Sequence, residues 1–198
     1  MKTILSAVHR AALPLGMLLL FPAMAHAHVG AGNTSGFSHG FWHPLGGLDH
    51  LCAMIAVGLW AAQMGGRSLW AVPLTFVAVM ALGGALGMAG VQIPFAEQGI
   101  VISVLTLGVL IAASARLALA PSIILVGLFA VFHGYAHGAE MPATASGLEY
   151  GIGFVLATAL IHLCGIGIGI GIQRLASAVF VRFAGAAIAL CGAYLWFG

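Results

Sequence analysis

Long apolar stretches with almost no charged residue inside them constrain this sequence more than any other feature. Crossing the hydrocarbon core of a bilayer takes about 20 consecutive apolar residues in a helix. Only 5% of the 198 residues are charged, whereas about a quarter are charged in soluble domains. Six suitable stretches lie at about 44–64, 70–90, 97–115, 121–139, 148–172 and 177–197. The sequence therefore predicts an all-α integral membrane protein with six transmembrane helices.

Residues 1–27 have the pattern of a cleavable signal peptide. A basic start precedes a short apolar run, and small residues follow it. Cleavage is predicted after Ala25 or after Ala27, so the mature chain begins at His26 or His28; an uncleaved membrane anchor is the alternative. Residues 28–198 then form one six-helix transmembrane domain.

Charged residues near the predicted helix ends indicate the orientation in the membrane. Positive residues prefer the cytoplasmic side. With the mature N-terminus outside, the inner connections hold the arginines and the outer connections hold only acidic residues; these are Arg67, Arg116, Arg174 and Arg182 inside, and Glu97, Glu140 and Glu149 outside. Both termini are therefore expected in the periplasm, and the protein in the inner membrane of a bacterium.

The remaining composition excludes several partners. The six Lys and Arg residues are spread along the chain and form no basic patch, so no nucleic-acid partner is predicted. No phosphate-binding P-loop occurs, so no nucleotide partner is predicted either. The cysteines Cys52, Cys164 and Cys191 have no paired spacing, and we interpret them as small buried hydrophobic residues.

Polar residues interrupt the first apolar stretch. His43, Asp49 and His50 lie at its start, although a charged carboxylate at mid-membrane costs about 3 kcal/mol on insertion scales. On a single helix over 44–64, His43 would lie two turns above His50. The two imidazoles are thus the nearest groups that can compensate Asp49.

The fourth apolar stretch ends with a second polar cluster. His133 and His137 lie four positions apart, and Glu140 lies three positions after His137. These side chains share one stripe of a helix. Two imidazoles at this spacing can hold one metal ion at a bond length of about 2 Å.

The depth of each residue predicts how the two clusters combine. At 1.5 Å per residue, His50 and His133 both lie roughly 9 Å below the outer surface. His43, His137 and Glu140 form a shallower ring at the mouth by the same count. His162 lies alone, roughly 20 Å down; a hydrogen-bonded structural residue is the first interpretation, and a role in releasing the ion inward is the alternative.

The mature N-terminus offers a further metal ligand. Cleavage before His28 would place a free amine beside its imidazole, which makes a bidentate chelator. Cleavage before His26 would give His-Ala-His, which suits square-planar Ni(II) or Cu(II). His39 lies in the same external segment. For this residue, a metal ligand and a solvated linker histidine are equal alternatives.

The two motifs, His43-x5-Asp49-His50 and Phe132-His133-Gly-x-Ala-His137-Gly-x-Glu140, resemble those of the HupE/UreJ family of bacterial nickel permeases. The resemblance covers the whole chain. It implies secondary transport of Ni(II) across the inner membrane, usually to supply hydrogenase or urease. It also implies that the motif histidines and carboxylates at these positions bind the ion.

The sequence thus predicts ATP-independent import of Ni(II), with Co(II) not distinguished, by a protein without a prosthetic group and without enzyme activity. The predicted metal ligands are His28, His43, Asp49, His50, His133, His137 and Glu140. The predicted partners of the protein are the metal ion and the lipid bilayer. The sequence leaves open whether the protein forms a homo-oligomer. Two other functions also stay open: an intramembrane zinc-dependent hydrolase, and a membrane partner that senses or delivers metal.

Overall fold

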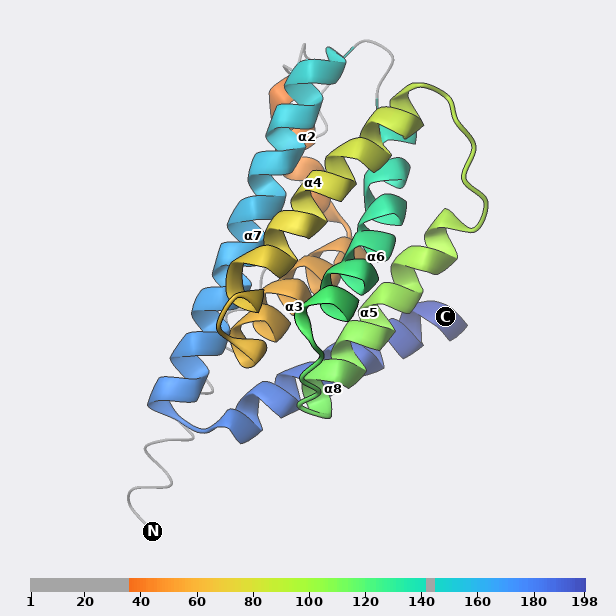
Figure 1. Ribbon diagram of the computed structural model, residues 1–198. Coiled ribbons are helices and arrows are strands. Elements are labelled where there is room, and N and C mark those ends of the chain that lie inside the picture. Colours follow the sequence, from red (N-terminus) through yellow and green to blue (C-terminus); the bar gives the residue numbers. More distant parts are fainter. Residues whose placement is uncertain (1–35, 142–144) are drawn as a thin grey trace.

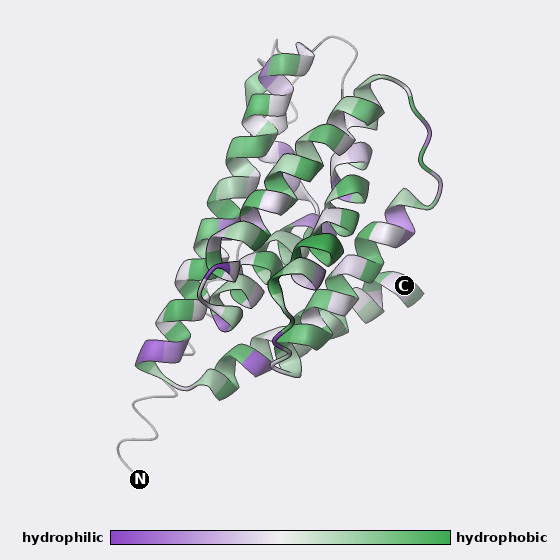
Figure 2. Ribbon diagram, viewed as in Figure 1, coloured by the Kyte–Doolittle hydropathy of each residue, from purple (hydrophilic) through white to green (hydrophobic). Residues whose placement is uncertain are grey.

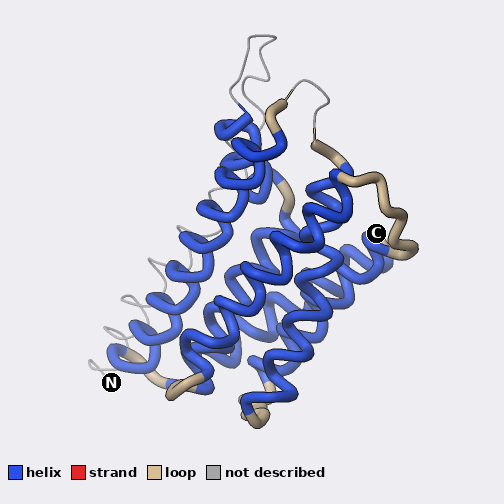
Figure 3. The backbone as a smooth tube through the Cα atoms, turned by 45° about the horizontal axis from the view of Figure 1, so that its top comes forward, coloured by secondary structure: helices blue, strands red, loops and turns tan. Residues whose placement is uncertain are grey.

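The computed structural model describes residues 36–141 and 145–198 (Figure 1). The predicted signal peptide and His28 lie outside these ranges. The described residues form seven helices: α2 (Gly36–Gly46), α3 (Leu48–Met64), α4 (Ser68–Met88), α5 (Ala96–Ala112), α6 (Leu119–Ala139), α7 (Gly147–Leu175) and α8 (Ala178–Phe197). They contain no strand (Figure 3). The all-α prediction is confirmed.

The helices run up and down, so their connections alternate between two ends of the bundle. The links α3–α4, α5–α6 and α7–α8 lie at the lower end in Figure 1, and the link α4–α5, the end of α6 and the start of α7 lie at the upper end. We call the lower end the arginine end, because Arg67 and Arg116 lie in its links and Arg174 in the last turn of α7. The upper end, with Glu97, Glu140 and Glu149, is the glutamate end.

Helix α3 is the centre of the bundle. All its residues from Ala53 to Gln63 are buried, and it packs against α4, α5, α7 and α8. Its last turns are fixed by side chains that bond to backbone: Trp60 Nε1 donates to the carbonyl of Ala115 at 3.0 Å, and Gln63 Nε2 donates to that of Ile111 at 3.1 Å. The polar residues at the start of α3 therefore stand on a fixed support.

Four described helices are long and apolar enough to cross a membrane, namely α4, α6, α7 and α8, and α2 with α3 adds a fifth if the pair counts as one span. Helix α5 has only 17 residues, or about 25 Å of helix. Apolar residues predominate along the helices (Figure 2), and each described helix exposes large apolar side chains, as lipid contact requires.

The single helix predicted over 44–64 is wrong. Residues 36–46 form α2, and α3 begins at Leu48 after a bend of 82°. Gly47 is extended at the bend, with φ −103° and ψ 125°. Two adjacent glycines, Gly46 and Gly47, favour this break because glycine is the poorest helix former after proline. Pro44 therefore lies near the end of α2.

Glycines set the close approach between helices. A Cβ on Gly134 of α6 would overlap the carbonyl of Met80 on α4, and a Cβ on Gly58 of α3 would overlap that of His162 on α7. Gly165 of α7 likewise faces the backbone of Ile55 in α3, 2.5 Å from a Cβ built on it. Such small-residue contacts are typical of helix packing in membranes.

The cysteines differ from the expectation of isolated buried residues. Cys164 is exposed on α7, and Cys52 and Cys191 are partly buried. The Sγ atoms of Cys52 and Cys191 lie 3.8 Å apart, between α3 and α8. Spacing in the sequence could not reveal this pair, because its members lie 139 positions apart.

Candidate metal centre

The bend between α2 and α3 brings His43 to the end of α6. His43 Nε2 lies 3.1 Å from Glu140 Oε2, and its ring centroid lies 4.6 Å from that of His137. One ligand atom from each of these three residues lies within 4.8 Å of the others. Two atoms bound to one ion at about 2.1 Å are at most about 4.2 Å apart. Small side-chain movements therefore suffice to gather all three around an ion.

The first turn of α3 adds His50 to the same cluster. Asp49 Oδ1 accepts hydrogen bonds from the Nδ1 atom and from the backbone N–H of His50, each at 2.8 Å. The His50 ring lies 5.0 Å from the ring of His133 and 4.2 Å from that of His137, centroid to centroid. Because Nδ1 carries the proton in this arrangement, the lone pair is on Nε2.

The hydrogen bonds of Ser103 define the tautomer of His133. The Ser103 hydroxyl donates to the carbonyl of Ile100 at 2.6 Å, and its oxygen lies 2.9 Å from His133 Nε2. A hydroxyl has one proton to donate, so His133 Nε2 must be the donor in the second bond. The lone pair of His133 is then on Nδ1.

These lone pairs have no hydrogen-bond partner among the described residues. His50 Nε2, His133 Nδ1 and both ring nitrogens of His137 are buried and unpartnered there. Leaving a buried polar atom unpaired costs about 1–3 kcal/mol. Several such atoms in one cluster mark a site built to bind something, and neutral imidazole nitrogens are ligands for Ni, Co, Cu and Zn ions.

Burial increases from one side of the cluster to the other. The side chains of Glu140 and His43 are 57% and 32% exposed, whereas His137 and His133 are 2% and 0% exposed. Glu140 and His43 therefore form the mouth at the glutamate end, and His133 is the innermost member of the cluster.

The structure brings together six of the seven residues predicted to bind metal: His43, Asp49, His50, His133, His137 and Glu140. The predicted ring of His43, His137 and Glu140 forms one group of possible ligands, and the His137 ring also contacts His50, so the ring and the deeper residues adjoin. Asp49 contacts the ring of His50 and supports that imidazole. The seventh residue, His28, lies outside the described part of the chain.

Two neighbours of the cluster had no signal in the sequence. Ser103 is one hydroxyl inside an apolar helix, and only the packing of α5 against α6 brings it to His133. Phe76 of α4 lies against the inner side of the cluster, with its ring centroid 5.5 Å from that of His133. Neither residue belongs to a motif, so only contacts between helices identify them.

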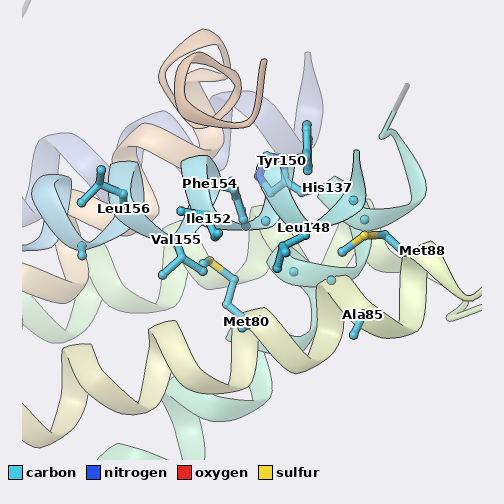
Figure 4. Close-up of a pocket in the computed structure, with 17 residues that line it drawn as sticks. Met80, Ala85, Met88, His137, Leu148, Tyr150, Ile152, Phe154, Val155 and Leu156 are labelled. Atoms are coloured by element: carbon cyan, nitrogen blue, oxygen red, sulfur yellow. The ribbon is translucent and has the colours of Figure 1, made fainter. Parts of the chain in front are cut away.

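A groove of about 850 Å³ between α4, α6 and α7 reaches the side of the cluster (Figure 4). Its walls are mostly apolar, with Met80, Met88 and Leu148 among them, and His137 and Tyr150 also line it, near Leu148 (Figure 4). A hydrated ion gains nothing from such walls. The mouth formed by His43 and Glu140 is therefore the better entrance for a cation.

The apolar helices and the histidine cluster between them define a multi-pass membrane protein with a buried polar site. The sequence matches the family described as HupE / UreJ protein over residues 16–195. It is 43% identical to Protein HupE of Rhizobium leguminosarum bv. viciae over 180 residues, which is 91% of this chain and 94% of that protein. No solved structure matches the chain.

The chain therefore belongs to the HupE/UreJ family. This is a family of membrane transporters connected broadly with nickel or cobalt. The resemblance seen in the two histidine motifs is confirmed by both comparisons.

Proposed function

We propose that this protein carries Ni(II), or Co(II), from the periplasm to the cytoplasm without ATP. One observation carries the proposal: buried imidazole nitrogens from α3 and α6 converge beside a carboxylate-lined mouth and lack partners among the described residues. Family membership supports transport over other uses of such a site. The proposed metal site comprises His28, His43, Asp49, His50, His133, His137 and Glu140, in which Asp49 acts through the His50 imidazole that it holds.

The proposal includes the orientation in a bacterial inner membrane. The signal peptide is removed, the bent pair α2–α3 together with α4 to α8 makes six crossings, and both termini face the periplasm. Support comes from the separation of charges, because the arginine end then faces the cytoplasm as positive residues prefer. The mouth at Glu140 then faces the periplasm.

Charge balance favours a divalent cation at this site. Asp49 and Glu140 bring two negative charges to the cluster when both are ionised. Ions are costly in a low-dielectric interior unless opposite charges accompany them. Two carboxylates therefore match the double charge of Ni(II) or Co(II), and the neutral imidazoles replace the water ligands that the ion loses.

Transport follows the gradient of burial. Glu140 and His43 collect the ion where the side chains are exposed, and His137 passes it to His50 and His133. Because imidazole must be neutral to ligate a metal ion, binding releases protons from any protonated histidine and weakens at acid pH.

Uptake of radioactive nickel into proteoliposomes tests the proposal. Saturable uptake is expected for the unsubstituted protein, with a loss of about tenfold or more in His50→Ala and His133→Ala. Cys164→Ala, at an exposed position of α7, is the control and should leave uptake unchanged. Uptake that persists unchanged in both histidine variants would refute the proposed site. Binding without uptake would favour a sensing or delivery role, and hydrolysis of a lipid amide would favour a zinc enzyme.

A further inference from the structure

We propose that His162 on α7 is a second binding position for the ion, on the inner side of the histidine cluster. This inference rests on the proposed transport function and extends its route past His133. Of the two sequence-based interpretations of His162, it favours a role in transport over a hydrogen-bonded structural residue.

The side chain of His162 lacks the partners that a structural histidine needs. It is 1% exposed, and neither Nδ1 nor Nε2 has a hydrogen-bond partner among the described residues. A buried imidazole normally donates one hydrogen bond and accepts another, and each unpaired buried atom costs about 1–3 kcal/mol. An imidazole with two unpaired nitrogens is available to bind a ligand that the surrounding helices do not supply.

A shared aromatic neighbour connects His162 to the cluster. The Phe76 ring lies 5.1 Å from the ring of His162 and 5.5 Å from that of His133, centroid to centroid. The remaining rings continue the series toward the mouth, because His133 lies beside His50 and His50 beside His137. His162 is thus one aromatic ring away from the innermost ligand of the proposed site.

Two further donor atoms lie one helical turn from the contact between His162 and Phe76. Thr158 precedes His162 by four residues on α7, and Met80 follows Phe76 by four residues on α4. Both are buried, and Thr158 Oγ1 lies 3.6 Å from Met80 Sδ. Imidazole nitrogen, hydroxyl oxygen and thioether sulfur together suit a transition-metal ion better than Mg²⁺ or Ca²⁺.

The depth of His162 suits an intermediate position. It lies 15 residues from Gly147 and 13 residues from Leu175, the two ends of α7, or about 22 and 20 Å of helix. The backbone there is fixed against α3, because a Cβ on Gly58 would overlap the His162 carbonyl. The backbone of α7 therefore holds the His162 imidazole at a fixed depth near the middle of the membrane.

Three protein variants test this inference in proteoliposomes with Ni²⁺ as the probe. His162→Gln keeps a polar side chain of similar length but removes the imidazole, whereas His162→Cys supplies a thiolate that can ligate nickel. Ile161→Val, at the neighbouring buried position on α7, is the packing control. The outer cluster is unchanged in all three, so the KM for Ni²⁺ should stay within about twofold of the unsubstituted value.

We expect His162→Gln to lower the maximal uptake rate about tenfold or more, His162→Cys to recover part of that loss, and Ile161→Val to transport normally. A maximal rate of His162→Gln within twofold of the unsubstituted protein would overturn the inference. Equal losses in His162→Gln and His162→Cys would overturn it too, because they would indicate a packing role.

The same assay separates this inference from the proposed function. Uptake that is lost in His50→Ala but unchanged in His162→Gln refutes the inference alone. Absence of any uptake by the unsubstituted protein refutes the proposed function and the inference together.

Discussion

Removing the charge of Asp49 should weaken metal binding without removing an imidazole. Asp49 Oδ1 accepts two hydrogen bonds from His50, both at 2.8 Å, and one of them holds the proton on Nδ1. The proton at Nδ1 leaves Nε2 as the ligand atom. Without the carboxylate, the ring can rotate or place its proton on Nε2, where it blocks the metal.

The expected magnitude follows from these contacts. Carboxylates that support a metal-bound histidine contribute about 10–100-fold in affinity, which corresponds to about 1.4–2.8 kcal/mol. Asn retains an oxygen acceptor, so Asp49→Asn should lose about tenfold and Asp49→Ala about 100-fold. Asp49 also lies in the first turn of α3, where a negative charge stabilises a helix by about 0.3–1 kcal/mol.

Equilibrium dialysis of the purified protein with radioactive nickel measures the affinity, and thermal unfolding in detergent measures the stability. Glu149→Gln is the matched control, since Glu149 is an exposed carboxylate in the first turn of α7. It should reproduce the small loss of stability without the loss of affinity. Nickel affinities of Asp49→Asn and Asp49→Ala within twofold of the unsubstituted protein would show that Asp49 does not orient His50 for binding.

Three further outcomes are expected. Ser103→Ala should weaken nickel binding by about tenfold, because His133 loses the acceptor that holds its Nε2 proton; unchanged dialysis curves would contradict the inferred tautomer. Binding should weaken at acid pH, because protons compete with the metal ion for the imidazole nitrogens, by on the order of tenfold per pH unit for each histidine that is protonated in the metal-free protein; affinity that stays flat down to the pH at which the protein unfolds would exclude imidazole ligands. Gly165→Ala should lower the unfolding temperature, since overpacking costs about 1–3 kcal/mol. Gly167→Ala should not lower it, because no atom of a neighbouring segment lies within 4 Å of a Cβ built there. Equal thermal shifts would refute this account of the α3–α7 contact.

Helix positions and the composition of the polar cluster follow from local sequence. Apolar length fixes where α4, α6, α7 and α8 lie, because each needs only its own residues to satisfy its backbone in lipid. The four-residue spacing of His133 and His137 likewise places both rings on one face of α6 whatever surrounds that helix. These features required no knowledge of neighbouring segments.

The bend at Gly47 depended on tertiary structure. A glycine pair allows a helix to continue or to break, and local preferences differ by only about 1 kcal/mol per glycine. Packing of α2 along α7 decides the outcome, with Gly40 against the backbone of Tyr150. His43 reaches Glu140 across the bend and not by standing two turns above His50.

The partners of the buried histidines were also decided by tertiary structure. Ser103 and Phe76 are 30 and 57 residues away from His133 in the chain, and nothing in their own segments distinguishes them from packing residues. Contacts between helices assign Ser103 to His133 and place Phe76 between His133 and His162. The sequence by itself determined which ligand types this protein carries, because residue chemistry is local. Only the packed helices decided which nitrogens keep free lone pairs, because a hydrogen-bond partner is a property of the neighbouring helix.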